Sequence, residues 1–136
     1  MTAGPETQLF AMLAEITGGM MKIRELLAAN PAVTRATRGC DLQRYRGTMD
    51  PETLSFESYV EADTHSGKTF VWSLDVNLTP TAWTVDRIVA EQISEGWDNQ
   101  RDFDDAIFDS FDAMAGRFPA LIAEFIESAR DFAFGR

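Results

Sequence analysis

Two stretches of the chain alternate apolar and polar residues one by one, and this alternation is the strongest constraint on the fold. In residues 54–63 and 70–78, every second residue is apolar or small and its neighbours are mostly polar. A period of two is typical of β-strands with one buried and one solvated face. The segments THSGK (64–68) and TPTA (79–82) contain turn residues that suit short connections. We therefore predict an antiparallel meander, with a first strand in CDLQRYRG (40–47) and a fourth from Trp83.

On the N-terminal side of this region the period changes to that of a helix. Apolar residues in the segment 6–29 recur at steps of three and four, which places them on one stripe of an amphipathic helix. They are Leu9, Leu13, Ile16, Met20, Ile23 and Leu27. Asn30 and Pro31 predict the end of this helix, because proline disfavours a helical residue before it. Gly18 and Gly19 predict either the close approach of a neighbouring backbone or a break in the helix, and we expect one helix with a bend as an option.

The C-terminal segment also has helical spacing, in its apolar residues from Phe103 to Phe132. Asp102 and Asp109 are candidate N-caps. Pro119 predicts a kink or a break, since it lacks an amide hydrogen and its ring clashes with the preceding turn. In an alternative interpretation, residues 97–109 form a loop or a short fifth strand and the helix starts at Ser110.

These patterns predict one α+β domain over residues 1–136. A chain of 136 residues is long enough for a single core but short for two. We predict a two-layer sandwich, in which a four-stranded antiparallel meander is covered on one face by an N-terminal and a C-terminal helix. The other face of the sheet would stay open.

The charge balance limits the classes of partner. The chain has 22 acidic and 12 basic residues and a formal net charge of -10. Such a surface repels nucleic acid and anionic membranes and attracts cationic partners. No apolar run approaches the ~20 residues that span a bilayer. The N-terminal segment MTAGPETQ does not have the pattern of a secretory signal, and there is one cysteine. We therefore expect a cytoplasmic protein.

The side chains that commonly carry catalysis are few. His65 is the only histidine and falls in a predicted turn, and Cys40 has no candidate base nearby. The segment DNQRDFDD (98–105) lacks the central glycine and the closing glutamate of a calcium loop. We predict no catalytic, metal-binding or cofactor-binding residue, and no cofactor.

Four of the twelve basic residues lie in RATRGCDLQRYR (35–46). This cluster would form either an anion site or charge pairs within its own sheet. We favour the pairs, with Arg44 facing Glu57 and Arg38 facing Asp63 across the first hairpin. Exposed cross-strand pairs of this kind contribute about 0.2–1 kcal/mol each.

On the open face of the predicted sheet, apolar and acidic side chains form one patch. The second hairpin would pair Tyr59 with Ser73, and the third would pair Ser73 with Ile88. A semi-apolar centre inside an acidic rim is typical of a partner-binding surface, although an ordinary sheet face also exposes some apolar side chains. Leu42, Tyr59, Val71, Ser73 and Ile88 form the centre, and Glu57, Glu61, Asp75 and Asp86 form the rim.

We accordingly predict a non-enzymatic protein-binding domain whose open face holds a basic or amphipathic protein partner. By analogy of class, an immunity-type or antitoxin-type inhibitor and a secretion chaperone are its concrete forms. The alternative is a small-ligand module or enzyme with a pocket between helices and sheet, and a homodimer across the open face is a third possibility. That pocket would be lined by Trp72, Phe56, Trp83 and Phe111.

Two expectations concern the covered face. Trp72 and Phe56 should be among the most buried residues, because they lie at the centre of the apolar face. Arg87 falls on an inward position opposite Leu74, where an unpaired charge is too costly. The strand should therefore bulge near Asp86 and Arg87, which would return Ile88 to the core, or a carboxylate should pair with Arg87.

Overall fold

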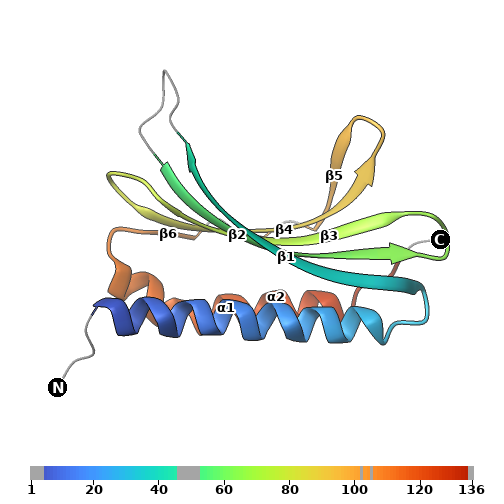
Figure 1. Cartoon of the computed structure of the whole chain (residues 1–136), viewed down its shortest axis with the longest axis horizontal. Helices are drawn as coiled ribbons and strands as arrows, with labels where there is room; N and C mark the ends of the chain where they lie inside the picture. The colour runs from blue at the N-terminus through green and yellow to red at the C-terminus, as the bar shows by residue number, and fades with distance from the viewer. Residues whose placement is uncertain (1–4, 46–52, 102, 105, 135–136) are drawn as a thin grey trace.

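The computed structural model describes residues 5–45, 53–101, 103–104 and 106–134, with side chains for all of these except 5–6, 41–45 and 53. The strands form one antiparallel sheet in the order β1-β2-β3-β4-β5, and β6 also pairs with β4. Both helices lie along the same face of this sheet (Figure 1). The elements are α1 (Pro5–Ala28), β1 (Val33–Tyr45), β2 (Thr53–Thr64), β3 (Thr69–Leu78), β4 (Trp83–Ile93), β5 (Gly96–Arg101), β6 (Ala106–Phe108) and α2 (Phe111–Arg130).

The predicted α+β class is confirmed, with terminal helices and an antiparallel sheet. The predicted count of four strands is wrong, because the described residues form six, and the alternative of a short fifth strand within residues 97–109 is confirmed by β5. The two additional strands both pair with β4. Gly96 has a φ of 131°, a conformation that favours glycine, and it opens β5 directly after the turn. Every residue of β5 is exposed. Without a buried face the strand has no alternation of burial, and the sequence pattern did not separate it from a helix.

Helix α1 is continuous through its two glycines. The buried stripe consists of Met12, Ile16, Met20, Ile23 and Leu27, whereas Leu9 is exposed. A Cβ at position 19 would lie 2.7 Å from Cγ2 of Ile122 in α2. The expectation of one helix is confirmed, and the neighbour that approaches Gly19 is a side chain of α2 and not the predicted backbone.

Helix α2 starts after Ser110, whose hydroxyl accepts a hydrogen bond from the amide of Ala113 (3.1 Å). This is the alternative start given by the sequence. Asp109 is not the N-cap, and Asp102 lies outside the described residues. Of the kink or break expected at Pro119, the break is wrong, because α2 is one helix with the proline inside it, and the kink stays a prediction. Buried residues on both sides of the proline, such as Phe118 and Leu121, pack into the core and hold both halves of the helix against the sheet.

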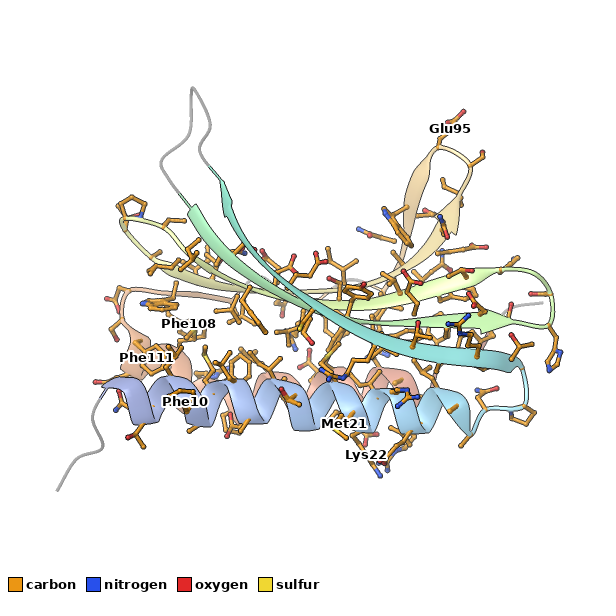
Figure 2. All side chains as sticks on the ribbon, in the orientation of Figure 1. Phe10, Met21, Lys22, Glu95, Phe108 and Phe111 are labelled. Carbon is orange, nitrogen blue, oxygen red and sulfur yellow. The ribbon has the colours of Figure 1, made fainter. Side chains whose placement is uncertain are left out.

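The core fills the space between the sheet and the helices. Figure 2 shows the side chains there, including Phe108 and Phe111. Trp72 is fully buried, as predicted, and its indole nitrogen donates a hydrogen bond to the hydroxyl of Ser128 (3.1 Å). Phe56 is only partly buried, so that half of the prediction is wrong. It lies near the start of β2, where the β1–β2 hairpin bends away from the helices (Figure 1).

The ladder between β3 and β4 is regular at Arg87, which pairs with Leu74. The expected bulge is absent there, and the alternative of a carboxylate partner is confirmed. Nη1 of Arg87 donates to Oε1 of Glu124 (3.0 Å) and to the carbonyl of Leu121 (3.1 Å), both in α2. The guanidinium also lies over the ring of Phe103, 4.7 Å from its centroid.

The register of the first hairpin differs from the prediction by three residues. Arg38 pairs with Val60 and Arg44 with Leu54, whereas Arg35 is the residue opposite Asp63. The predicted pairs Arg44–Glu57 and Arg38–Asp63 are therefore wrong. An odd shift in register moves every residue of a strand to the other face. The observed register places Gly39 opposite Tyr59 and Asp41 opposite Glu57.

Candidate functional site

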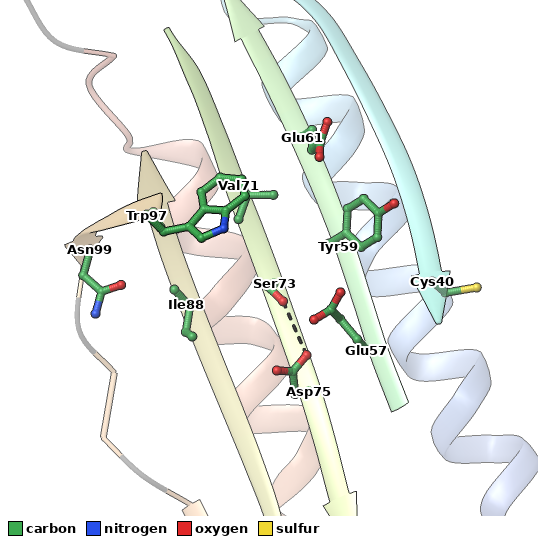
Figure 3. Close-up of a pocket in the computed structure, with 11 residues that line it drawn as sticks. Cys40, Glu57, Tyr59, Glu61, Val71, Ser73, Asp75, Ile88, Trp97 and Asn99 are labelled. Carbon is green, nitrogen blue, oxygen red and sulfur yellow. Dashed lines mark hydrogen bonds between the residues drawn. The ribbon is translucent and has the colours of Figure 1, made fainter. Parts of the chain in front are cut away.

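The sheet face turned away from the helices is hollowed. The β1–β2 hairpin and the β4–β5 hairpin bend away from the helices on either side of the central strands (Figure 1). Between them lies a hollow of about 550 Å³ whose lining comes from five strands (Figure 3). The lining residues are Cys40, Glu57, Tyr59, Glu61, Val71, Ser73, Asp75, Ile88, Ala90, Trp97 and Asn99.

The hollow contains most of the patch expected from the sequence. The registers predicted for the second and third hairpins are confirmed, because Tyr59 pairs with Ser73 and Ser73 with Ile88. These pairs bring together seven of the predicted residues, and Asp86 lies in an adjoining hollow of about 240 Å³ that Asp75 also lines. The side chain of Leu42 is not among the side chains that the structure describes. The backbone of Leu42 pairs with Phe56, because the register of the first hairpin differs from the predicted one.

A row of carboxylates crosses the central strands. Glu57, Asp75 and Asp86 are direct partners across β2, β3 and β4. Like charges opposite one another destabilise a sheet. Burial, together with the charges of Glu57 and Asp86, raises the pKa of Asp75 to about 6 from 3.8, although a hydrogen bond from Ser73 (3.4 Å) opposes the shift. Asn77 donates a hydrogen bond to Asp86 (3.0 Å). A positive charge placed over this row would relieve the repulsion.

Two aromatic side chains stand on opposite sides of the hollow. The ring of Tyr59 leans over Gly39, where a Cβ would collide with it. Trp97 projects from β5 beside Val71 and is 52% exposed (Figure 3). The floor between them includes Val71, Ile88 and Ala90. The hollow therefore combines apolar contact area with negative charge.

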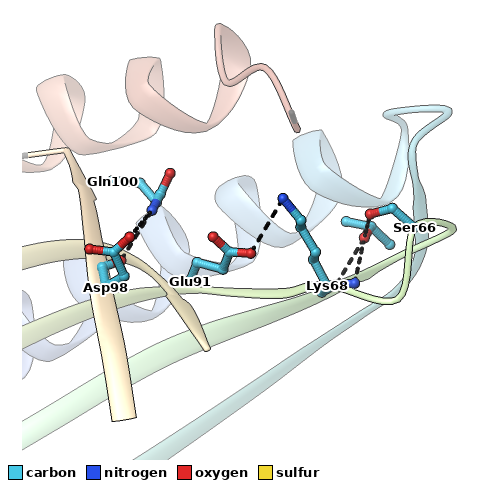
Figure 4. A network of polar contacts seen from close by, with 6 residues as sticks. Ser66, Lys68, Glu91, Asp98 and Gln100 are labelled. Carbon is cyan, nitrogen blue, oxygen red and sulfur yellow. Dashed lines mark hydrogen bonds and ion pairs between the residues drawn. The ribbon is translucent and has the colours of Figure 1, made fainter. Parts of the chain in front are cut away.

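Sequence reasoning did not name Trp97 and Asn99 of β5 as site residues, although its alternative interpretation allowed a short fifth strand within residues 97–109. The main interpretation placed these residues at the start of the C-terminal helical segment. The available signal was Gly96, a residue typical of turns that lies three positions after the end of β4 at Ile93. The remaining polar network at this end of the sheet includes the ion pair between Lys68 and Glu91 (3.6 Å) and a hydrogen bond from Gln100 to Asp98 (3.3 Å), both shown in Figure 4.

The described residues contain no group of three or more His, Cys, Asp and Glu side chains that could hold a metal ion. His65 lies in the turn between β2 and β3, where its amide donates to the carbonyl of Ala32 (3.0 Å). Cys40 is an exposed thiol in β1.

The space proposed for the alternative pocket, between helices and sheet, is occupied by packed rings. The ring centroids of Trp83 and Phe111 are 5.4 Å apart, and those of Trp72 and Phe132 are 4.9 Å apart. Phe134 also packs on Phe70 and Trp72. Of the four residues predicted to line that pocket, Trp72 belongs to the buried core, and Phe56, Trp83 and Phe111 pack against it.

No protein-family model, curated protein or solved structure matches the chain. Within the part of the chain that the structure describes, neither helix is long and apolar enough to cross a membrane.

Proposed function

We propose that the protein is a non-enzymatic binding domain that holds a basic, amphipathic segment of a partner protein in the hollow on its open sheet face. The observation that carries the proposal is the presence of carboxylates and apolar side chains in one concavity. Glu57, Glu61 and Asp75 line the same hollow as Val71 and Trp97. An apolar centre provides burial after docking, and the surrounding charge raises the encounter rate with a cationic partner. Inhibition or chaperoning of a basic cytoplasmic protein is a role that such a surface suits.

The charges favour a different protein over a second copy of this chain. An isologous dimer across the open face would bring the acidic patch that contains Glu57, Asp75 and Asp86 against the same patch of the other copy. Like-charge contacts across an interface cost several kcal/mol. A cationic segment has the opposite effect, because it neutralises a row that already repels itself.

The test uses labelled peptides of about 14 residues, four helical turns, made of leucine and lysine. Binding is measured by fluorescence anisotropy at low and high salt. We expect binding that weakens with salt, and a loss of at least about tenfold in the Glu61→Lys, Asp75→Lys double variant. The matched control is Glu25→Lys, Glu127→Lys, which makes the same charge change at exposed positions of the helix layer.

The control should lose less than about threefold in affinity, since its substitutions lie far from the hollow. Equal losses in both double variants would show that net charge alone attracts the peptides and would overturn the proposal. If the lysine variant does not fold, Glu61→Gln, Asp75→Asn makes the same comparison with smaller changes, against Glu25→Gln, Glu127→Gln.

A further inference from the structure

The floor of the hollow limits the backbone conformation that an occupant can adopt. Strands β2 and β3 carry Glu57, Tyr59, Glu61, Val71, Ser73 and Asp75, and each is paired along both of its edges. The backbone groups of these two strands are already used, so this part of the floor offers an occupant side chains only. An extended segment lying there would bury amide and carbonyl groups without partners, at about 1–3 kcal/mol for each such group. A helix satisfies its own backbone.

The spacing of the charges fits a helix lying across the strands. Glu57 and Glu61 are four residues apart on β2, which corresponds to about 13 Å along the strand. A helix with its side chains is about 10–12 Å wide. It therefore fits between the row Glu57, Asp75 and Asp86 on one side and Glu61 on the other.

The period of the row matches a helix as well. Its three members lie on adjacent strands, which are about 4.8 Å apart. Successive turns of a helix are about 5.4 Å apart along its axis. Basic side chains on one flank of a helix, one turn apart, would therefore each lie close to one carboxylate of the row.

The aromatic side chains complete this arrangement. Tyr59 leans toward β1 over Gly39, which leaves the centre of the floor to Val71, Ser73 and Ile88. Trp97 rises from β5 at the other side, and its exposed indole offers a large apolar area to a ligand that lies on the floor.

From these observations, and resting on the function proposed above, we infer that the occupant is an amphipathic α-helix of the partner, laid across β2, β3 and β4. Its apolar stripe lies on Val71, Ile88 and Trp97. Lysines or arginines one turn apart on one flank lie over Glu57, Asp75 and Asp86.

Two leucine–lysine peptides of the same composition test this inference. One has leucines at helical spacing and the other alternates leucine and lysine, the spacing of a strand. Both are used where light scattering shows each peptide to be monomeric. We expect the helical peptide to bind at least about tenfold more tightly and to gain helical circular dichroism when bound. The Glu57→Gln, Asp75→Asn variant and the Trp97→Ala variant should each weaken it at least about fivefold, whereas Phe10→Ala, at an exposed aromatic of α1 (Figure 2), should not.

The outcomes separate the two proposals. If the alternating peptide binds equally or more tightly, the partner segment is extended, and the inference is wrong although the proposed function stands. The proposed function itself fails if neither peptide binds. It also fails if the Glu61→Lys, Asp75→Lys substitutions leave the affinity for both peptides unchanged. A dimer of the protein alone that Trp97→Ala dissociates would identify a second copy as the occupant and would overturn the inference.

Discussion

The two faces of the sheet differ in the charge of the groups that lie next to their charged side chains. On the helix-covered face, Arg87 is the buried charged residue among those described, with 2% of its side chain exposed. Its charge is matched by Glu124, by the carbonyl of Leu121 and by the ring of Phe103. On the open face, by contrast, carboxylates on three adjacent strands lie directly opposite one another.

The two faces therefore differ in what their charged side chains contribute to stability. The buried guanidinium of Arg87 contacts α2 and the segment before β6. It therefore joins separate elements of the fold and contributes to stability. A row of like charges weakens the sheet that carries it. A ligand that brings positive charge would offset this loss, which supports the binding role that we propose for the open face.

The largest expected effect compares the two tryptophans, one on each face. Trp72→Ala should lower the free energy of unfolding by about 3–5 kcal/mol, because it removes a fully buried ring and leaves a cavity. Trp97→Ala should lower it by less than about 1 kcal/mol, since half of that side chain is exposed. Urea unfolding followed by circular dichroism measures both. Similar losses for the two variants would contradict the division of the faces.

A smaller effect concerns Arg87 and its partner. Arg87→Ala should cost about 2–4 kcal/mol, because it removes buried packing as well as hydrogen bonds to α2. Glu124→Gln should cost less than about 1 kcal/mol, since the side chain of Glu124 is 56% exposed and its amide replacement still accepts a hydrogen bond. Chemical unfolding at neutral pH compares them. If Glu124→Gln is as harmful as Arg87→Ala, the ion pair rather than the packing holds α2 to β4.

The sequence predicted the fold best where a strand has one buried face. The alternation in β2 and β3 gave both strands, and the short turn at Gly67 fixed the register of their hairpin. The first hairpin has a longer connection, residues 46–52, which constrains register less, and the prediction there was wrong by three residues. Strand β5 has no buried face and could not be found by alternation.

The same reasons explain which parts of the candidate site could be predicted. Glu57, Tyr59, Val71, Ser73 and Asp75 lie on correctly paired strands, and the structure brings them together. Leu42 was placed with them through the wrong register of the first hairpin, and Trp97 of β5 was not named as a site residue. The concavity itself depends on the bend of two hairpins relative to the sheet. A pattern of burial does not encode that bend.

The smallest expected effect is a pH-dependent gain in stability in Asp75→Asn. The pKa of Asp75 is about 6 in the folded protein, above its ordinary value of 3.8, so the folded state holds this proton more tightly than the unfolded chain does. The stability that this proton contributes is present below pH 3.8 and is lost as the pH rises through 6. At pH 7.5 the ionised carboxylate therefore destabilises the protein, and Asp75→Asn should raise the free energy of unfolding by about 1 kcal/mol, a value that allows for the partial exposure of the group.

The gain should shrink steadily when urea unfolding is repeated from pH 7.5 down to pH 4.5, where the wild-type carboxyl is largely protonated in the folded state. Asp112→Asn, in the exposed first turn of α2, is the control. It should show a slight loss, because it removes a favourable interaction with the helix dipole. A gain in Asp75→Asn that is the same at every pH would mean that repulsion along the row does not weaken the sheet. The contrast between the two faces would then rest on shape and not on charge.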